Sequence, residues 1–170
     1  MNNLLNFFNE LEIKELKKQN TYSRAEIIVK KLFQGKVDKG GHPYLEHLYY
    51  VGNHLEDVDM KTVGILHDLL EDTIITKQDL KEMGFSNRII EAISIITKGE
   101  NEPYNDYIDK ILESNNIIAI NVKAIDMRHN LDITRIKNPT EKDLIRIETK
   151  YKPNYERIIK YLKEKENQIW

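Results

Sequence analysis

The fold class of this 170-residue chain depends on one stretch, Ile117-Ile118-Ala119-Ile120-Asn121-Val122-Lys123-Ala124-Ile125-Asp126-Met127. Its first four residues alone are typical of a buried strand. The continuation Val122-x-x-Ile125-x-Met127 spaces apolar residues as a helix does. No other stretch alternates at period two over a useful length, so no partner strand is available. The sequence therefore predicts an all-α fold, a compact helical bundle.

Nearly every other segment of the chain also has helical periodicity, and capping signals mark the expected boundaries. The expected helices cover about residues 3–18, Ser23 to Gly35, Pro43 to Leu55, 60–71, Thr76 to Gly84, a segment capped by Ser86, 104–114 and 116–131, followed by a C-terminal pair. The second of these helices begins with a Ser23-x-x-Glu26 capping box. The C-terminal pair begins at Thr140-x-x-Asp143 and is expected to be broken or kinked by Pro153.

Composition is that of an ordinary globular domain, with 40% hydrophobic and 32% charged residues. We expect residues 1–170 to form a single domain, since a chain of this size can bury roughly 70% of its unfolded surface. The net charge of −2 offers no bulk attraction to nucleic acid or to an anionic membrane, so neither is an expected partner. No apolar run reaches the roughly 18 residues of a membrane span.

The N-terminal segment does not resemble a signal peptide. Its apolar pairs, Leu4-Leu5 and Phe7-Phe8, are separated by Asn6 and followed by Glu10 and Glu12, without a positive start or an unbroken apolar run. The chain has no cysteine, which excludes disulfides, thiolate ligands and a cysteine nucleophile. We expect a cytoplasmic protein whose oligomeric state the sequence leaves open.

The chemistry is concentrated in Ile65-Leu66-His67-Asp68-Leu69-Leu70-Glu71-Asp72-Thr73. On a continuous helix His67 and Glu71 share one face, and Asp68 and Asp72 share the adjacent face. Buried carboxylates need a cation or hydrogen-bond donors, and a divalent metal ion meets that need. An isolated His-Asp pair is more often part of a solvated face, but four such groups in an apolar helix favour a site.

Two distant segments carry matching groups. One is Gly41-His42-Pro43-Tyr44-Leu45-Glu46-His47, a helix start with a histidine one turn inside. The other is Val122-Lys123-Ala124-Ile125-Asp126-Met127-Arg128-His129-Asn130, in which Asp126 and Asn130 are four residues apart on one helix face.

In this order, Pro-Tyr-x-x-His, His-Asp-x-x-Glu-Asp-Thr and Val-Lys-x-x-Asp-x-x-x-Asn resemble the HD-type hydrolase domain of RelA/SpoT-type (p)ppGpp enzymes. They resemble the small stand-alone HD proteins related to those enzymes more closely still. The resemblance extends from about Leu32 to Arg135. It implies a helical bundle with one divalent ion, usually Mn²⁺, with Mg²⁺, Fe²⁺ or Co²⁺ as alternatives. The implied ligands are His47, His67, Asp68 and Asp126.

The resemblance also makes Glu71 and Asp72 the catalytic carboxylates and Asn130 a contact to the substrate or to a metal ligand. Two imidazoles and two carboxylates suit a borderline divalent ion better than Ca²⁺. Four protein ligands leave about two positions on an octahedral ion, for a water and a phosphate oxygen. We expect Glu71 to be the main general base, assisted by Asp72.

A phosphorylated substrate needs cations and a surface for its base. Expected substrate contacts are Lys123 and Arg128 beside Asp126, Lys39 in the glycine loop, and Tyr104, which could stack on a base or simply pack at a helix start. For Lys39, and for Lys98 after the isoleucine-rich helix, a plain solvated lysine is the competing interpretation.

The sequence departs from the RelA/SpoT pattern where nucleotide contacts are expected. In relatives an Arg-Lys pair before Pro-Tyr helps bind the guanine nucleotide, whereas this chain has Asp38-Lys39. Leu131-Asp132-Ile133 replaces a basic-and-threonine run after the asparagine. We therefore hypothesise that Asp38 marks a changed substrate.

Three functions stay open at this point. The leading one is (p)ppGpp 3′-pyrophosphate hydrolysis. The second is hydrolysis of another small nucleotide, such as a nucleoside mono- or triphosphate. The third is a metal-bound sensor or partner-binding domain without turnover, against which the intact Glu71-Asp72 pair argues. Because 170 residues leave no room for a synthetase domain beside this one, we expect no ppGpp synthesis from them.

Overall fold

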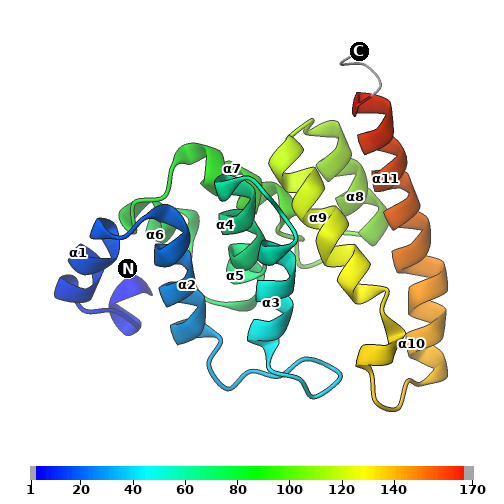
Figure 1. The fold of residues 1–170 in the computed structure, drawn as a ribbon, viewed down its shortest axis with the longest axis horizontal. Helices are drawn as coiled ribbons and strands as arrows, with labels where there is room; N and C mark the ends of the chain where they lie inside the picture. The colour runs from blue at the N-terminus through cyan, green and yellow to red at the C-terminus, as the bar shows by residue number, and fades with distance from the viewer. Residues whose placement is uncertain (1–2, 167–170) are drawn as a thin grey trace.

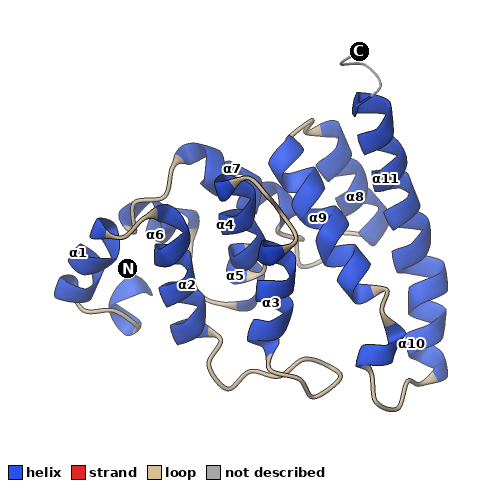
Figure 2. Ribbon diagram, viewed as in Figure 1, coloured by secondary structure: helices blue, strands red, loops and turns tan. Residues whose placement is uncertain are grey.

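The stretch that decides the fold class is a helix in the computed structural model, which describes residues 3–166. Within that range the regular structure is helical, with no β-strand and one isolated bridge between Val37 and Pro43 (Figure 2). The all-α prediction is confirmed. The helices are α1 Glu10–Lys18, α2 Thr21–Leu32, α3 Tyr44–Asn53, α4 Val58–Leu66, α5 Leu69–Asp72, α6 Lys77–Glu82, α7 Asn87–Ile96, α8 Tyr104–Glu113, α9 Ile117–Asn130, α10 Glu141–Arg146 and α11 Lys152–Glu166.

Helix α9 joins the two sides of the bundle (Figure 1). It packs against α3, α4 and α7 on one side and against α8 and α11 on the other. Most of its length is buried, including Ile118, Val122 and Met127, which agrees with its nearly continuous apolar sequence. Since Asp126 also lies on this buried helix, its carboxylate is presented to neighbouring elements rather than to bulk solvent.

Helices α3 and α4 approach each other closely at two glycines. A Cβ atom on Gly52 would lie 2.4 Å from the Cγ2 atom of Ile65, and one on Gly64 would lie 2.9 Å from the Cα atom of Gly52. Only residues without a side chain permit this approach. The contact holds α3, which carries His47, against α4, which ends next to His67.

Several predicted caps are confirmed. Thr76 and Asp79 form a capping box at the start of α6, Ser86 caps α7, and Thr140 and Asp143 form a capping box at the start of α10. These devices satisfy the first free N–H groups of a helix with a side chain a few residues away.

The N-terminal boundaries differ from the prediction. A continuous helix over 3–18 does not form, because α1 begins after Asn9, whose side chain and that of Glu12 form a capping box. The residues before it include a 3₁₀ turn, Asn3–Asn6. Ser23 does not cap α2, because Asn20 takes that role by accepting a hydrogen bond from the Ser23 N–H.

The predicted helix over 60–71 is also interrupted. Helix α4 ends at Leu66 and α5 begins at Leu69, so His67 and Asp68 occupy a turn between them. At the C-terminal end, where a break or a kink is predicted at Pro153, the helix is not broken. Instead α10 continues through a π-helical segment, Ile147–Tyr151, directly into α11, and Pro153 lies in the first turn of that helix.

Candidate active site

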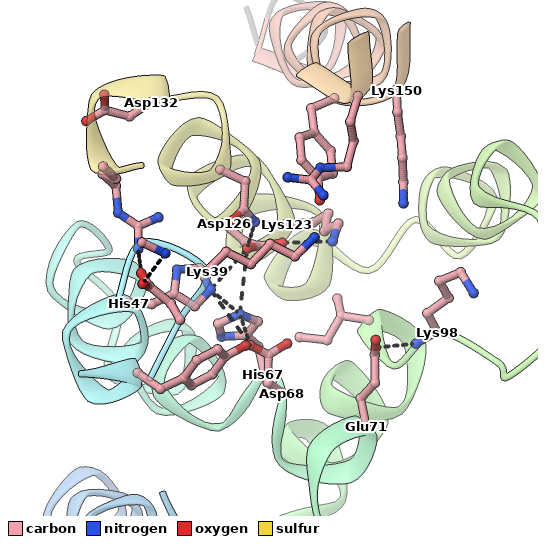
Figure 3. A pocket seen from close by; sticks show the side chains of 18 of the residues that line it. Lys39, His47, His67, Asp68, Glu71, Lys98, Lys123, Asp126, Asp132 and Lys150 are labelled. Atoms are coloured by element: carbon pink, nitrogen blue, oxygen red, sulfur yellow. Dashed lines mark hydrogen bonds and ion pairs between the residues drawn. The ribbon is translucent and has the colours of Figure 1, made fainter. Parts of the chain in front are cut away.

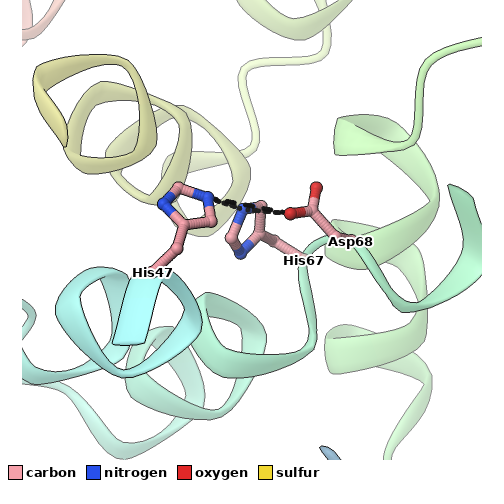
Figure 4. A group of neighbouring side chains, drawn as sticks. All are labelled: His47, His67 and Asp68. Atoms are coloured by element: carbon pink, nitrogen blue, oxygen red, sulfur yellow. Dashed lines mark hydrogen bonds and ion pairs between the residues drawn. The ribbon is translucent and has the colours of Figure 1, made fainter. Parts of the chain in front are cut away.

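Four side chains from three parts of the chain converge at the turn between α4 and α5. His47 comes from α3, His67 and Asp68 from the turn itself, and Asp126 from α9. Figure 4 shows His47, His67 and Asp68 pointing toward one another. The Nε2 atoms of the two histidines are 3.2 Å apart, and His67 Nε2 lies 3.1 Å from Asp68 Oδ2. Asp126 Oδ1 lies 3.3 Å from His47 Nε2 and 3.7 Å from His67 Nε2.

The helix interruption explains how adjacent residues reach one point. On a continuous helix, successive side chains point about 100° apart around the axis. In the turn, Asp68 has φ −93° and ψ 1°, outside helical geometry, and its carboxylate meets the imidazole of the preceding residue. The tertiary structure thus corrects the assumption of one continuous helical face.

Hydrogen bonds orient these donors. His67 Nδ1 lies 2.6 Å from the carbonyl oxygen of Gly64, which can only accept, so Nδ1 carries the proton and Nε2 faces the cluster. Asp68 Oδ2 accepts a hydrogen bond from the Tyr44 hydroxyl at 2.5 Å. Asp126 accepts from Lys123 Nζ at 2.7 Å and from Asn130 Nδ2 at 2.6 Å, one on each carboxylate oxygen.

Part of this donor set could hold a divalent metal ion, because one ligand atom each of His47, His67 and Asp68 lies within 4.8 Å of the other two. Nitrogen and oxygen ligands about 2.0–2.2 Å from an ion lie about 2.8–3.6 Å from each other at octahedral or tetrahedral angles. The Nε2 and carboxylate oxygen atoms of the cluster lie 3.1 to 3.7 Å from one another, close to this range. His47 and His67 are each about 95% buried, so the Nε2 lone pairs that face the cluster need a partner from within the site.

The electrostatics of the cluster also favour a cation. Burial alone would lower the pKa of His67, but the carboxylates of Asp68 and Asp126 outweigh it and raise the pKa to about 9. Burial would raise the pKa of Asp68, yet the neighbouring His67 brings it down to about 2. For Asp126 burial acts in the same direction, but Lys123 and the two histidines hold its pKa well below the ordinary value. The site therefore stabilises positive charge at its centre.

The cluster lies at one side of a cavity of about 450 Å³, shown in Figure 3. Loop 37–40, α9 and the C-terminal segment 146–151 supply much of the remaining wall. Cationic side chains are prominent in this wall, namely Lys39, Lys98, Lys123, Arg135, Arg146 and Lys150. Aromatic rings of Tyr44, Tyr104, Tyr107 and Tyr151 also line it. A cavity with this lining suits a phosphorylated ligand with an aromatic part.

The two expected catalytic carboxylates occupy different positions. Glu71 lines the cavity and accepts a hydrogen bond from the backbone N–H of Lys98 at 3.2 Å. Asp72 does not line the cavity, and its carboxylate lies 3.7 Å from Lys36 Nζ. Partial burial raises the pKa of both groups. Of the two, the geometry brings only Glu71 to the cavity.

Only some of the expected substrate contacts lie at the cavity. Lys39, Tyr104, Lys123 and Asn130 line the cavity. Arg128 does not, because it lies two residues after Asp126, on the opposite side of α9. Its Nε donates to the Tyr50 hydroxyl at 3.2 Å, and its side chain packs over that ring.

Three cations in the wall were missed by sequence reasoning: Arg135 after α9, and Arg146 and Lys150 near the π-helical segment. Arg146 Nε is buried without a hydrogen-bond partner among the described residues. Burial and the nearby Lys123 and Lys98 lower the pKa of Lys150. Arg146 and Lys150 are four residues apart in the sequence, a spacing that indicates a shared helical face. No nearby residue pattern indicates that this face lines the cavity.

Asp38 is not a free anion in the cavity. Its Oδ1 atom accepts from the backbone N–H groups of Gly40 and His42 at 2.8 and 3.0 Å, and its Oδ2 atom pairs with Arg135. The hypothesis that Asp38 marks a changed substrate therefore cannot rest on an uncompensated negative charge, because the Arg135 guanidinium pairs with it.

Comparison with known proteins yields distant relatives of RelA/SpoT type. The chain is 27% identical over 124 residues to a GTP pyrophosphokinase of Myxococcus xanthus, covering 64% of this chain and 16% of that protein. It is 24% identical over 139 residues to the bifunctional (p)ppGpp synthase/hydrolase SpoT of Escherichia coli K12, covering 74% of this chain and 20% of SpoT. A guanosine-3′,5′-bis(diphosphate) 3′-pyrophosphohydrolase of Escherichia coli O157:H7 matches to the same extent.

These matches support a relationship to RelA/SpoT-type enzymes that act on ppGpp. The chain spans only about a sixth to a fifth of the length of these relatives. No protein-family model matches it. Among the described residues, no helix is both long and apolar enough to cross a membrane.

Proposed function

We propose that this chain is an HD-type, metal-dependent phosphohydrolase of a phosphorylated nucleotide, with (p)ppGpp 3′-pyrophosphate hydrolysis as the leading reaction. One observation carries the proposal: the cluster of His47, His67, Asp68 and Asp126 opens on a cavity lined by cations, with Glu71 in the wall. The relatives named as ppGpp hydrolases support the same substrate class.

His47, His67, Asp68 and Asp126 would hold the metal ion, for which Mn²⁺ is our first candidate. When bound, a divalent ion lowers the pKa of a water molecule and polarises a phosphate oxygen. Lys123 and Asn130 keep the Asp126 carboxylate in place through both of its oxygens. The Tyr44 hydroxyl holds Asp68 by donating a hydrogen bond to its Oδ2 atom.

Glu71 is the proposed general base. Burial raises the pKa of Glu71, which makes its carboxylate a better proton acceptor. The attacking water would lose one proton to Glu71 as its oxygen bonds to phosphorus. The bond between phosphorus and the nucleotide 3′-oxygen would break, and that oxygen would take up the proton that Glu71 had accepted, giving pyrophosphate and a free 3′-hydroxyl.

The cationic wall would bind the phosphate groups. Lys39, Lys98 and Lys150 line the cavity, and no carboxylate among the described side chains forms a close ion pair with them. A polyphosphate entering the cavity would supply the missing negative charge. A cationic ligand would be repelled by these lysines, and a neutral ligand would gain no charge attraction from them.

Hydrolysis of another nucleotide is the second candidate, and Asp38 favours it. This residue stands where relatives of the RelA/SpoT pattern have an arginine that helps bind guanine, and its carboxylate is engaged with Arg135. The phosphate end of the substrate would then be recognised as in relatives, and the base differently.

The test is a product analysis with purified protein and Mn²⁺. The substrates are ppGpp, pGpp, GTP, GDP and GMP, with ATP plus GDP added to detect pyrophosphate transfer. We expect Mn²⁺-dependent release of pyrophosphate from ppGpp. The Glu71→Gln variant serves as the reference with strongly reduced activity. Faster cleavage of another nucleotide would favour the second candidate.

Two results would contradict the proposal. Formation of ppGpp from ATP and GDP would assign the chain to the synthetic activity named for the Myxococcus relative. Binding of Mn²⁺ and nucleotide without any turnover would assign it to a sensor or partner-binding role.

A further inference from the structure

His129 contacts a proposed metal ligand directly and has no role in the function proposed so far. Its Nδ1 atom lies 2.6 Å from Nδ1 of His47, and both residues are more than 90% buried. The ring centres are 4.9 Å apart and the planes differ by only 12°. Because the two nitrogens are much closer than the ring centres, the rings meet edge to edge. This is the geometry of an N–H···N hydrogen bond.

The positions of the other ring nitrogens indicate which histidine donates. His47 Nε2 faces the cluster, 3.2 Å from His67 Nε2 and 3.3 Å from Asp126 Oδ1. An imidazole that binds a metal through Nε2 must carry its proton on Nδ1. His47 therefore donates through Nδ1, and the neutral His129 accepts through its own Nδ1.

The acceptor is unusual for a metal-binding histidine, whose second nitrogen ordinarily donates to a carboxylate, a backbone carbonyl or water. His67 has the ordinary arrangement, with the carbonyl of Gly64. For His47, the hydrogen-bond acceptor is a side chain, that of His129.

His129 is itself held firmly. Its ring stacks on that of Tyr50, with centres 3.9 Å apart and planes within 16°. It also lies on α9, three residues after Asp126. One helix therefore supplies a ligand of the cluster and the support for a second ligand on α3.

We propose that His129 is a positioning residue, which fixes the proton of His47 on Nδ1 and orients its Nε2 atom toward the metal ion. This inference rests on the metal site of the proposed function, but it does not depend on the substrate or on turnover.

The first test is Mn²⁺ affinity of the whole chain, measured by calorimetric titration without nucleotide. His129→Phe keeps a ring of similar size for Tyr50 but cannot accept a hydrogen bond, and we expect affinity to fall about 10- to 100-fold. His129→Asn places an amide oxygen near the position of Nδ1, and we expect it to stay within about threefold of the wild type. His54→Phe is the matched control, because the His54 ring also contacts the Tyr50 ring but is exposed and contacts no ligand of the cluster.

The second test is NMR of the Zn²⁺-loaded, ¹⁵N-labelled protein, since Zn²⁺ is diamagnetic. We expect a proton on His47 Nδ1 and a nitrogen–nitrogen coupling across the hydrogen bond to His129 Nδ1. A purely structural role would not produce this coupling, and His129→Phe should abolish it while circular dichroism shows an intact helical fold.

Equal Mn²⁺ affinity of His129→Phe and wild type would overturn the inference, and so would an equal loss in the Phe and Asn variants. A missing Nδ1 proton on His47 would do the same. If the wild type binds Mn²⁺ but hydrolyses no nucleotide, the proposed function fails and this inference stands. If the wild type binds neither Mn²⁺ nor Zn²⁺, both fail.

Discussion

The carboxylate of Asp38 pairs with the guanidinium of Arg135, 97 residues further along the chain. The pair is largely shielded from solvent, and Gly40 packs against the backbone at the same place. A Cβ atom on Gly40 would lie 2.1 Å from the carbonyl oxygen of Arg135. The loop that precedes α3 is thus attached to the segment that follows α9, at one end of the cavity.

This relationship changes what a substitution at Asp38 should do. Asp38→Arg would bring two guanidinium groups together and remove the acceptor of the Gly40 and His42 N–H groups. We expect it to destabilise the protein by about 1–3 kcal/mol, measured by urea unfolding. Asp38→Asn keeps the loop acceptor and should cost less. Asp38→Arg could instead be as stable as wild type and raise kcat/KM for ppGpp more than for other nucleotides. In that case the Asp38–Arg135 pair is unimportant for stability, and the hypothesis that Asp38 marks a changed substrate is supported.

Metal binding should depend on residues that are distant in the sequence. We expect Asp126→Ala and His47→Ala each to reduce bound Mn²⁺ to near zero by elemental analysis, because each removes one donor from a cluster of four. Arg128→Ala is the control, since Arg128 lies on α9 near Asp126 but packs on Tyr50. One full metal equivalent in Asp126→Ala would exclude Asp126 as a ligand.

Glu71 and Asp72 should be separable. Glu71→Gln keeps the shape of the side chain but removes the base, and we expect turnover to fall roughly 10²- to 10⁴-fold with Mn²⁺ affinity unchanged. Asp72→Asn should lower turnover less than about tenfold, because Asp72 faces Lys36 outside the cavity. Single-turnover kinetics at saturating Mn²⁺ measure both. A larger loss in Asp72→Asn would reverse the assignment of the base.

The raised pKa of His67, about 9 without metal, predicts a pH dependence of metal binding. Below that pKa a proton on His67 competes with the metal ion, so affinity should rise about tenfold per pH unit from pH 7 toward 9. Titrations in buffers of different ionisation enthalpy should show about one proton released per Mn²⁺ at pH 7. Affinity that is constant over this range would mean that His67 is already neutral.

The stability of the metal-free protein should change in the opposite direction. A histidine whose pKa is higher in the folded state than in the unfolded chain, about 6.5, stabilises the fold fully below the unfolded value. That contribution is lost as pH rises through the folded pKa of about 9. Thermal unfolding should therefore show a Tm that falls between pH 6.5 and 9 in wild type and falls less in His67→Gln.

Much of this protein was determined by the sequence alone, wherever the relevant interactions are local. The caps at Thr76, Ser86 and Thr140 act within a few residues, so their signals can be read directly. The same holds for α9, whose apolar residues extend too far for a strand. The residues whose donors converge, His47, His67, Asp68 and Asp126, were all named from the motifs that carry the resemblance.

Only the tertiary structure decided how the site is assembled. The turn at His67 and Asp68 interrupts an apolar segment whose local pattern favours an unbroken helix, and its hydrogen bonds and ion pairs to other elements compensate for the lost helical geometry. The partners of Asp38 and of His47 are 97 and 82 residues away. Such contacts depend on how whole helices pack, and no signal within a window of residues encodes them. For this reason the proposed metal ligands could be predicted from the sequence, whereas the cations that surround them depend on the tertiary structure.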